Sequence, residues 1–353
     1  MAVLGAPIVI DGSHGEGGGA LLRTALQMAA ITQQPLRMVN IRTGTKNPGL
    51  TAEDITLLKA LALSSNAEVL GGTVGEQSLS FLPTRHAKGL NEKLDIEEAY
   101  DGPGVASALV VLNAMVPIMA RAGVYSKLLA IGETYGNNVL SYDYFANVTA
   151  QAYRRMGIYL FPEIPLAGFG RNSRGEVRLE IEPSAIAGLE WDKRGKLLAV
   201  RAVIATGELS EQVGERGIAH LARLAYHAKL ELETDAVQVR SKSTGAFVTV
   251  WSEFENGLIG ATAMGQRGVR IEAVAQNAFE QFFIWHKTDA TLDPFLADQI
   301  LVAAAIAEGE TSFRVPDLTR RFLSKVWVIK QFLPIHLTVR GKEGEPGIVS
   351  IKR

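Results

Sequence analysis

The chain has 353 residues, of which 47% are hydrophobic, and it carries no cysteine and a formal net charge of −1. The lack of cysteine excludes disulfides, thiolate zinc sites and cysteine nucleophiles, and the balanced charge excludes a protein that coats nucleic acid, so any RNA or DNA contact should be local. No signal peptide or bilayer span is expected, because residues 1–5 lack a basic flank and the longest apolar stretch, 105–120, is broken by polar residues and Pro117. We therefore expect a cytoplasmic protein without membrane contact.

Hydrophobic periodicity predicts an α/β fold. In chain order, the predicted elements are a strand at 7–10, a helix at 18–31, a strand at 36–42, a helix at 51–64, two short strands in 69–82, a helix after a glycine-containing loop in 101–121, a strand at 126–132, a helix at 142–156, a strand at 176–182, a helix at 297–307 and a strand at 332–339. Thr51, with Asp54 three residues later, is placed to cap the helix of 51–64.

Two features of these elements indicate how the chain is organised. The apolar helices 19–31, 104–120 and 297–307 are alike in composition, which favours a threefold repeat of a β-α unit; the alternative is that buried helices of α/β proteins simply look alike. The segment 189–285 is more charged, and the apolar pattern resumes after it. We predict a large domain of residues 1–187 and 289–353 and a smaller inserted α/β domain of residues 188–288.

The most informative segment is the loop between the first predicted strand and the first helix. It holds five glycines between positions 12 and 19, among them Gly17 and Gly18, and glycine lets a ligand approach the backbone closely. The N-terminus of the next helix offers unpaired N–H groups, so the loop predicts a phosphate site. Glu16 and His14 add an acid and an imidazole, which indicate a metal ion or an activated hydroxyl as well.

The loop also satisfies the pattern Gly-x-Gly-x-x-Ala at Gly15, Gly17 and Ala20, which is typical of dinucleotide-binding folds. Two features oppose that interpretation. The strand predicted next ends in Asn-Ile-Arg rather than in the acid that holds a ribose, and Glu16 would point into the pyrophosphate. A Walker loop is excluded because the chain has no Gly-Lys-Ser/Thr.

Further motifs follow this loop in a fixed order. They are Asp11-Gly-Ser-His-Gly-Glu-Gly-Gly-Gly with Arg23, Ile41-Arg42-Thr-Gly, Asn47-Pro48-Gly49-Leu50, Val213-Gly214-Glu215-Arg216, Gly265-Gln266-Arg267-Gly268-Val269, Leu296-Ala297-Asp298-Gln299 and Phe332-Leu333-Pro334. In sequence and order, they resemble the RNA 3′-terminal phosphate cyclases. The similarity extends from Ile8 to about Ile351.

The resemblance implies a fold, a reaction and ligands. The fold is a large domain of repeated β-α units, each a four-stranded sheet with two helices, plus a small inserted α/β domain. The family uses ATP and a divalent metal, Mg²⁺ or Mn²⁺. A histidine takes AMP and passes it to an RNA 3′-phosphate, and the neighbouring 2′-hydroxyl then displaces AMP to close a 2′,3′-cyclic phosphate.

The resemblance also implies roles for individual residues. They are Glu16 as the loop acid near metal and phosphate, Arg23 and Arg42 as phosphate-binding arginines beside Gly17 and Gly18, Asp298 and Gln299 as the pair near the nucleotide, and Asp143 as an acid in the helix bordering the adenine. Guanidinium suits phosphate because it stays charged and can grip two oxygens. Outside this context, the arginines would be expected to form surface ion pairs and Asp298 to cap a helix.

The chain departs from the family at the catalytic position. An ungapped alignment of the stretch before Phe332-Leu333-Pro334 places Arg321 where the family has its histidine, and no histidine occurs between His286 and His336. Guanidinium has no lone pair to offer phosphorus and does not deprotonate in proteins, so Arg321 is expected to bind phosphate and not to carry AMP. Other differences are Thr45 for an arginine, Glu53 for an amide, an altered loop at 101–107, and residues 140–141 in place of a proline near the adenine.

Three functions fit these observations. The first is a cyclase that is adenylylated elsewhere, with His14 as the candidate nucleophile because His336 is expected on a buried strand. The second is a cyclase-like protein that binds an RNA 3′ end without being adenylylated. The third is a transferase acting on another small phosphorylated substrate. The sequence predicts neither the RNA partner nor the oligomeric state.

Overall fold

The fold is built from three units with one order of elements, β-α-β-α-β-β. The structure, a computed structural model, describes residues 5–96, 107–170 and 173–352. The first unit consists of β1 (Ile8–Asp11), α1 (Gly19–Thr32), β2 (Leu36–Val39), α2 (Ala52–Ser65), β3 (Glu68–Leu70) and β4 (Leu79–Leu82). Its sheet has the order β1-β2-β4-β3, with β1 parallel to β2 and the other pairs antiparallel.

The second and third units repeat this plan. The second contains β5 (Asn91–Asp95), α3 (Ala108–Ala120), β6 (Ser126–Gly132), α4 (Tyr142–Tyr144), a π-helical turn (Phe145–Thr149), α5 (Ala150–Arg155), β7 (Leu160–Leu166) and β8 (Gly175–Ile181). The third contains β9 (Glu190–Trp191), α8 (Pro294–Ile306), β14 (Thr311–Val315), α9 (Arg320–Phe332), β15 (His336–Arg340) and β16 (Gly347–Lys352). Their sheets have the orders β5-β6-β8-β7 and β9-β14-β16-β15, so the repeated β-α unit predicted from the apolar helices is confirmed.

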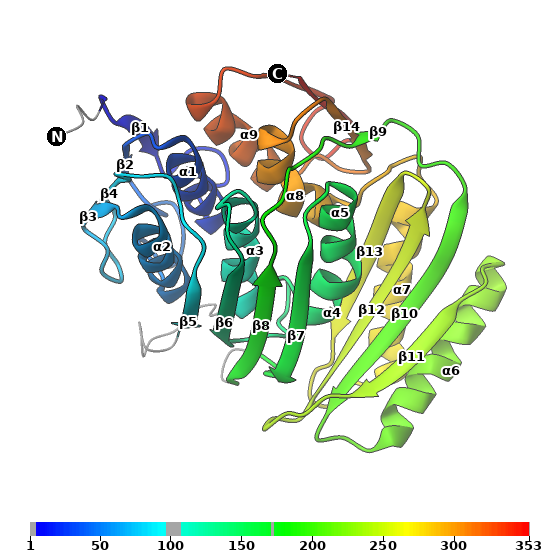
Figure 1. Ribbon diagram of the computed structural model, residues 1–353. Coiled ribbons are helices and arrows are strands. Elements are labelled where there is room, and N and C mark those ends of the chain that lie inside the picture. Colours follow the sequence, from blue (N-terminus) through cyan, green and yellow to red (C-terminus); the bar gives the residue numbers. More distant parts are fainter. Residues whose placement is uncertain (1–4, 97–106, 171–172, 353) are drawn as a thin grey trace.

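A fourth sheet is inserted between β9 and α8 of the third unit. The inserted segment contains β10 (Leu197–Gly207), α6 (Glu211–Ala228), β11 (Glu233–Gln238), β12 (Gly245–Phe254), β13 (Gly257–Met264) and α7 (Ile271–His286). Its strands have the order β11-β10-β12-β13. This insert lies beside the second unit, on the side away from the first (Figure 1).

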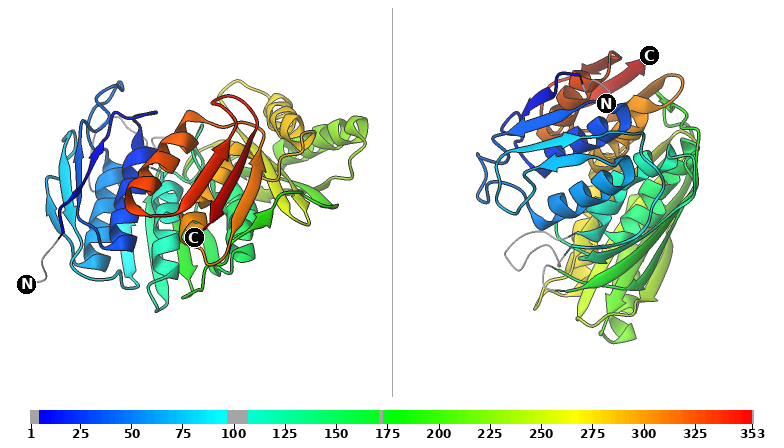
Figure 2. Two further views of the ribbon diagram at one scale, coloured as in Figure 1. Left: turned by 90° about the horizontal axis from the view of Figure 1, so that it is seen from above. Right: turned by 60° about the vertical axis from the view of Figure 1, so that its left-hand side comes forward.

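The three units share one hydrophobic core, and the insert has its own. In the shared core, the helices of the units pack against one another in the middle of the molecule while the sheets lie outside (Figure 2). A separate cluster lies under α6 and α7, where α6 buries Gly214, Gly217, Leu221 and Ala225 as a stripe at helical spacing. The separate cluster supports a proposed division into a large domain and an insert near residues 188–288, although β9, in that range, pairs with β14.

Local sequence explains most element boundaries. Asp54 accepts hydrogen bonds from the Thr51 N–H and hydroxyl at 2.9 and 2.8 Å, so the predicted cap of α2 is confirmed. The predicted strand 36–42 ends earlier, at Val39, because Asn40 and Arg42 adopt positive φ angles of 54° and 52°. No helix in the described residues is long and apolar enough to cross a bilayer. Of the loop expected to differ from the family, residues 101–106 lie outside the described ranges.

The strand predicted at 332–339 is wrong in its first half. Phe332 ends helix α9, and the strand begins only at His336, which is exposed instead of buried. The helix is fixed by tertiary packing, since Phe322, Val326 and Ile329 are buried at helical spacing while basic residues between them obscure the pattern.

Candidate functional site

A cavity of about 460 Å³ opens where helices of all three units meet. Residues in the first turns of five helices line it, namely Gly19 of α1, Glu53 of α2, Val110 of α3, Phe295 of α8 and Arg321 of α9. The N–H groups of Val110 and Phe295 are already bonded to the capping side chains of Ser107 and Asp293, but the N-terminal end of each helix still carries partial positive charge. The convergence of these helix ends makes the cavity a suitable site for a group with several negative charges.

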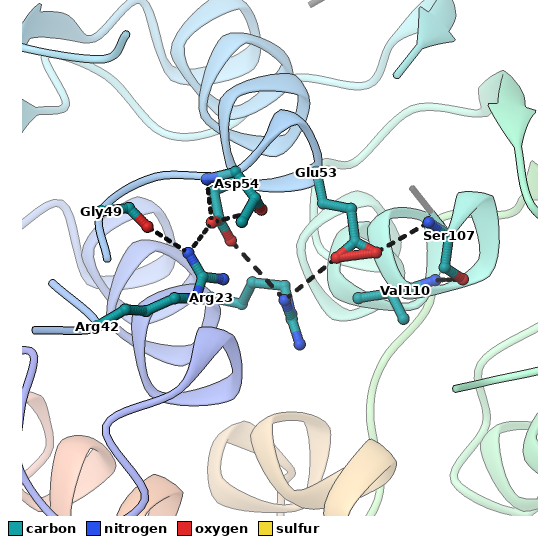
Figure 3. A network of polar contacts seen from close by, with 8 residues as sticks. Arg23, Arg42, Gly49, Glu53, Asp54, Ser107 and Val110 are labelled. Carbon is teal, nitrogen blue, oxygen red and sulfur yellow. Dashed lines mark hydrogen bonds and ion pairs between the residues drawn. The ribbon is translucent and has the colours of Figure 1, made fainter. Parts of the chain in front are cut away.

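Two arginines are fixed at the cavity wall by acids of α2 (Figure 3). Arg42 forms a hydrogen-bonded ion pair with Asp54 and donates to the Gly49 carbonyl at 2.9 Å. Arg23 Nη1 lies 3.7 Å from Glu53 Oε2 and 3.8 Å from Asp54 Oδ1. Arg23 and Arg42 therefore reach the same cavity from α1 and from the loop after β2.

Gly19 is needed where these arginines converge. A Cβ at this position would lie 2.6 Å from Arg23 Nη1 and closer still to Arg42 Nη2. Real Cβ atoms do not approach nitrogen that closely, so any larger residue would push the guanidinium groups apart. The last glycine of the loop thus serves the arginines directly, whereas Gly17 and Gly18 lie in the same loop but not among the residues that line the cavity.

Glu53 is a buried carboxyl at the cavity wall. Its residue is 5% exposed, and it accepts a hydrogen bond of 2.9 Å from the Ser107 N–H at the start of α3. Burial raises its pKa to about 7, against the opposing pull of Arg23. Burial thus favours the protonated form of Glu53, and its ionised form places negative charge beside Arg23.

Arg321 contacts the glycine loop at the edge of the cavity. Its Nε donates to Glu16 Oε1 at 3.3 Å, and both side chains line the cavity. Burial would lower the pKa of Arg321, but Asp298 and Glu16 hold it above its ordinary value. Ser324, on the same helix, accepts from the Glu16 N–H at 2.8 Å, so the loop and α9 are held together.

Glu16 has one oxygen left for a ligand. Its Oε2 is buried and has no hydrogen-bond partner among the described residues. No group of three acids or histidines capable of holding a metal alone occurs in that part of the chain. A Mg²⁺ ion that arrives with a nucleotide takes most of its ligands from phosphate and water, and one free carboxylate oxygen fits that mode of binding.

The predicted nucleotide pair lies on α8, next to α9. Asp298 and Gln299 both line the cavity. Asp298 Oδ1 lies 3.5 Å from Lys325 Nζ, and the Lys325 ammonium also donates to the Asp298 carbonyl. The Gln299 amide oxygen accepts from Thr149 in the π-helical turn. Lys325 and Phe295 were not among the predicted site residues. The signal for Lys325 was its position four residues after Arg321, on the same helix face.

Two other predicted residues lie outside the cavity lining. Asp143 is buried beside the Tyr135 hydroxyl, and burial raises its pKa to about 7. His14 stacks on Trp327 of α9, with ring centroids 3.9 Å apart. Neither Asp143 nor His14 is one of the described residues that line the cavity.

A second cavity of about 320 Å³ adjoins the first on the side of the insert. The two share Asn138, Val139, Leu140, Phe295 and Gln299 as lining residues. Aromatic side chains, Tyr144, Phe247 and Trp285, contribute to the second wall. A charged cavity joined to one with aromatic walls suits a ligand that combines phosphates with a flat base.

Comparisons with known proteins agree with this combination. A family model described as RNA 3′-terminal phosphate cyclase matches residues 14–339. The RNA 3′-terminal phosphate cyclase of Methanopyrus kandleri is 33% identical over 354 residues, covering 98% of each chain. Those of Methylococcus capsulatus and Pyrococcus furiosus are each 32% identical, over 97% and 98% of this chain and 95% and 99% of their own.

Proposed function

The chain belongs to the RNA 3′-terminal phosphate cyclase family, and we propose that it uses ATP to convert an RNA 3′-phosphate into a 2′,3′-cyclic phosphate. The family reaction activates the 3′-phosphate with AMP. The neighbouring 2′-hydroxyl then attacks the 3′ phosphorus, a P–O bond closes the ring, and AMP leaves. ATP and RNA are both available in the cytoplasm, where we propose that the protein acts.

One observation carries this proposal. Arg23, Arg42 and Arg321 come from three separate segments, yet all line one cavity into which five helices direct their first turns. A cation set of this kind holds a triphosphate and a second phosphate in place and stabilises the charge that develops on their oxygens during transfer. Asp298 and Gln299 of α8 complete the part of this cavity that we assign to the nucleotide, with Gln299 on the side of the second cavity.

Glu16 is the residue that would hold the divalent metal, through its free Oε2. When bound, Mg²⁺ or Mn²⁺ would neutralise phosphate charge and favour departure of pyrophosphate. Glu16 itself also orients Arg321, because the two side chains form an ion pair. Glu16 Oε1 thus pairs with Arg321, and Oε2 would be the ligand of the metal ion.

The pairing of Arg321 with Glu16 favours one further candidate function. Since guanidinium cannot carry AMP, a protein that only binds the RNA end in this cavity, without being adenylylated, also accounts for an arginine at this position. The two functions differ in whether ATP is consumed.

The experiment uses a short RNA with a labelled 3′-phosphate, ATP and Mg²⁺. Cyclisation makes the label resistant to phosphatase. We expect resistant product with the wild-type protein, at least tenfold less with R23Q, and no change with R37Q, because Arg37 is an exposed arginine of β2 outside the cavity. ATP-independent binding that prefers the 3′-phosphate over a 3′-hydroxyl, with no resistant product, would favour the second function. Equal binding of both ends, with no resistant product, would contradict both.

A further inference from the structure

The cavity contains a buried amine close to the position where the family has its histidine. Lys325 lies four residues after Arg321 on α9, so both side chains leave the same face of the helix, and both line the cavity. The Lys325 side chain is 9% exposed. Lys46, another lysine at the cavity, is exposed on a loop and keeps its hydration. Lys325 is thus a cavity-lining primary amine that is shielded from water.

The charged groups around Lys325 come from three helices. Asp298 of α8 lies 3.5 Å from its Nζ, and Arg23 of α1 and Arg321 of α9 add positive charge nearby. Burial lowers the pKa of Lys325, the two arginines act in the same direction, and Asp298 opposes them. The carboxyl oxygen that faces Nζ, Asp298 Oδ1, is buried and makes no hydrogen bond with a described residue. A proton acceptor is therefore in place next to the amine.

Resting on the proposed function, we infer that Lys325 Nζ is the nucleophile that takes AMP from ATP in this chain. An unprotonated amine has the lone pair that Arg321 lacks. Nζ attacks the α-phosphorus, a P–N bond forms, and the bond from the α-phosphorus to the bridging oxygen breaks. Pyrophosphate leaves with the electron pair, and the proton lost by Nζ passes to Asp298.

The second half of the cycle returns Lys325 to its starting state. An oxygen of the RNA 3′-phosphate attacks the same phosphorus, the P–N bond breaks, and Nζ recovers its proton from Asp298. AMP is then joined to the 3′-phosphate, ready to be displaced by the 2′-hydroxyl. Arg321 holds phosphate oxygens through these steps, which is a role that its fixed charge allows.

His14 is a poorer candidate for this role. Its ring stacks on Trp327 and is not among the residues that line the cavity. Replacing the Lys325 amine while leaving the histidine unchanged therefore separates the two possibilities.

The test incubates the full-length protein with ATP labelled at the α-phosphate and Mg²⁺, then denatures it. We expect covalent label that is released by mild acid and survives alkali, as a phosphoramidate is. Peptide mapping should find one added AMP on Lys325, with tryptic cleavage blocked there. K325R, which keeps the charge but has no nucleophile, should lose at least 95% of the label, whereas K330R on the exposed side of the same helix should keep it. ATP binding and thermal unfolding of both variants check that they fold.

Each outcome bears on the inference. Label on another residue, or label kept in folded K325R, would overturn it, and peptide mapping of the wild-type protein decides this even where K325R does not fold. Cyclised RNA without any protein label would also overturn it, while leaving the proposed function intact. Absence of label together with absence of cyclised RNA would remove both.

Discussion

Glu53 makes the stability of the protein depend on pH in a way that one substitution should reveal. The carboxyl is buried, and its pKa rises from the ordinary 4.5 to about 7. Because a pKa unit corresponds to about 1.4 kcal/mol, ionising Glu53 in the folded protein costs about 3 kcal/mol more than in the unfolded chain. The Gln side chain of E53Q keeps the oxygen that accepts from Ser107 and carries no charge.

The sign follows from proton binding. Between pH 4.5 and about 7, the folded protein holds the Glu53 proton that the unfolded chain has released, so stability falls as pH rises through this window. Below it Glu53 contributes no difference, and above it the whole cost is present. Between about pH 5.5 and about pH 8, the free energy of unfolding of E53Q should therefore gain about 2 kcal/mol on that of the wild type.

The assay is urea unfolding of the wild type and E53Q at the two pH values. At each pH, the difference between their free energies of unfolding removes the contribution of groups that titrate alike in both proteins. E68Q is the matched control, since Glu68 is an exposed carboxyl of β3, and its difference from wild type should not change with pH. A difference for E53Q that is the same at both pH values would refute the reasoning. So would a wild type that gains stability relative to E53Q as the pH rises.

Three further substitutions test other parts of the site. G19A should weaken ATP binding at least tenfold, about 1.4 kcal/mol, because its Cβ would displace both guanidinium groups, whereas G44A, where a Cβ meets nothing within 4 Å, should bind normally; equal calorimetric affinities would contradict this. R321H supplies an imidazole at the family position and should restore label transfer from ATP to a K325R background; a folded, ATP-binding double variant without label would show that position 321 is out of reach of the phosphorus. D293N should lower the free energy of unfolding by about 2 kcal/mol, since this buried carboxyl accepts from Tyr144, Gly260, Phe295 and Leu296; an unchanged urea midpoint would argue against that role.

The fold was largely predictable because its units repeat local signals. The apolar helices predicted near 19–31 and 297–307 are α1 and α8, the first helices of the first and third units, and the capping pair Thr51 and Asp54 begins α2 as expected. α9 was not predicted. Its buried face is defined by contacts with α1 and α8, and its Arg321 and Lys325 line a cavity that exists only once three units have met.

The candidate site was also predictable only where local motifs mark its residues. Arg23, Arg42, Asp298 and Gln299 could be placed from motifs, and all four line the cavity. The contact between Glu16 and Arg321 joins residues 305 positions apart, and no periodicity predicts such a pair. Lys325 was overlooked because a lysine in a helix normally lies in water, and only the assembled structure shows it buried beside Asp298.

A crystal structure of the protein with a non-hydrolysable ATP analogue and a short RNA ending in a 3′-phosphate tests the central claim most directly. We predict the triphosphate in the 460 Å³ cavity, in contact with Arg23 and Arg321, with the base in the adjoining cavity and the RNA phosphate beside Arg42. An analogue bound elsewhere on the molecule, with the three guanidinium groups contacting neither phosphate, would contradict the account.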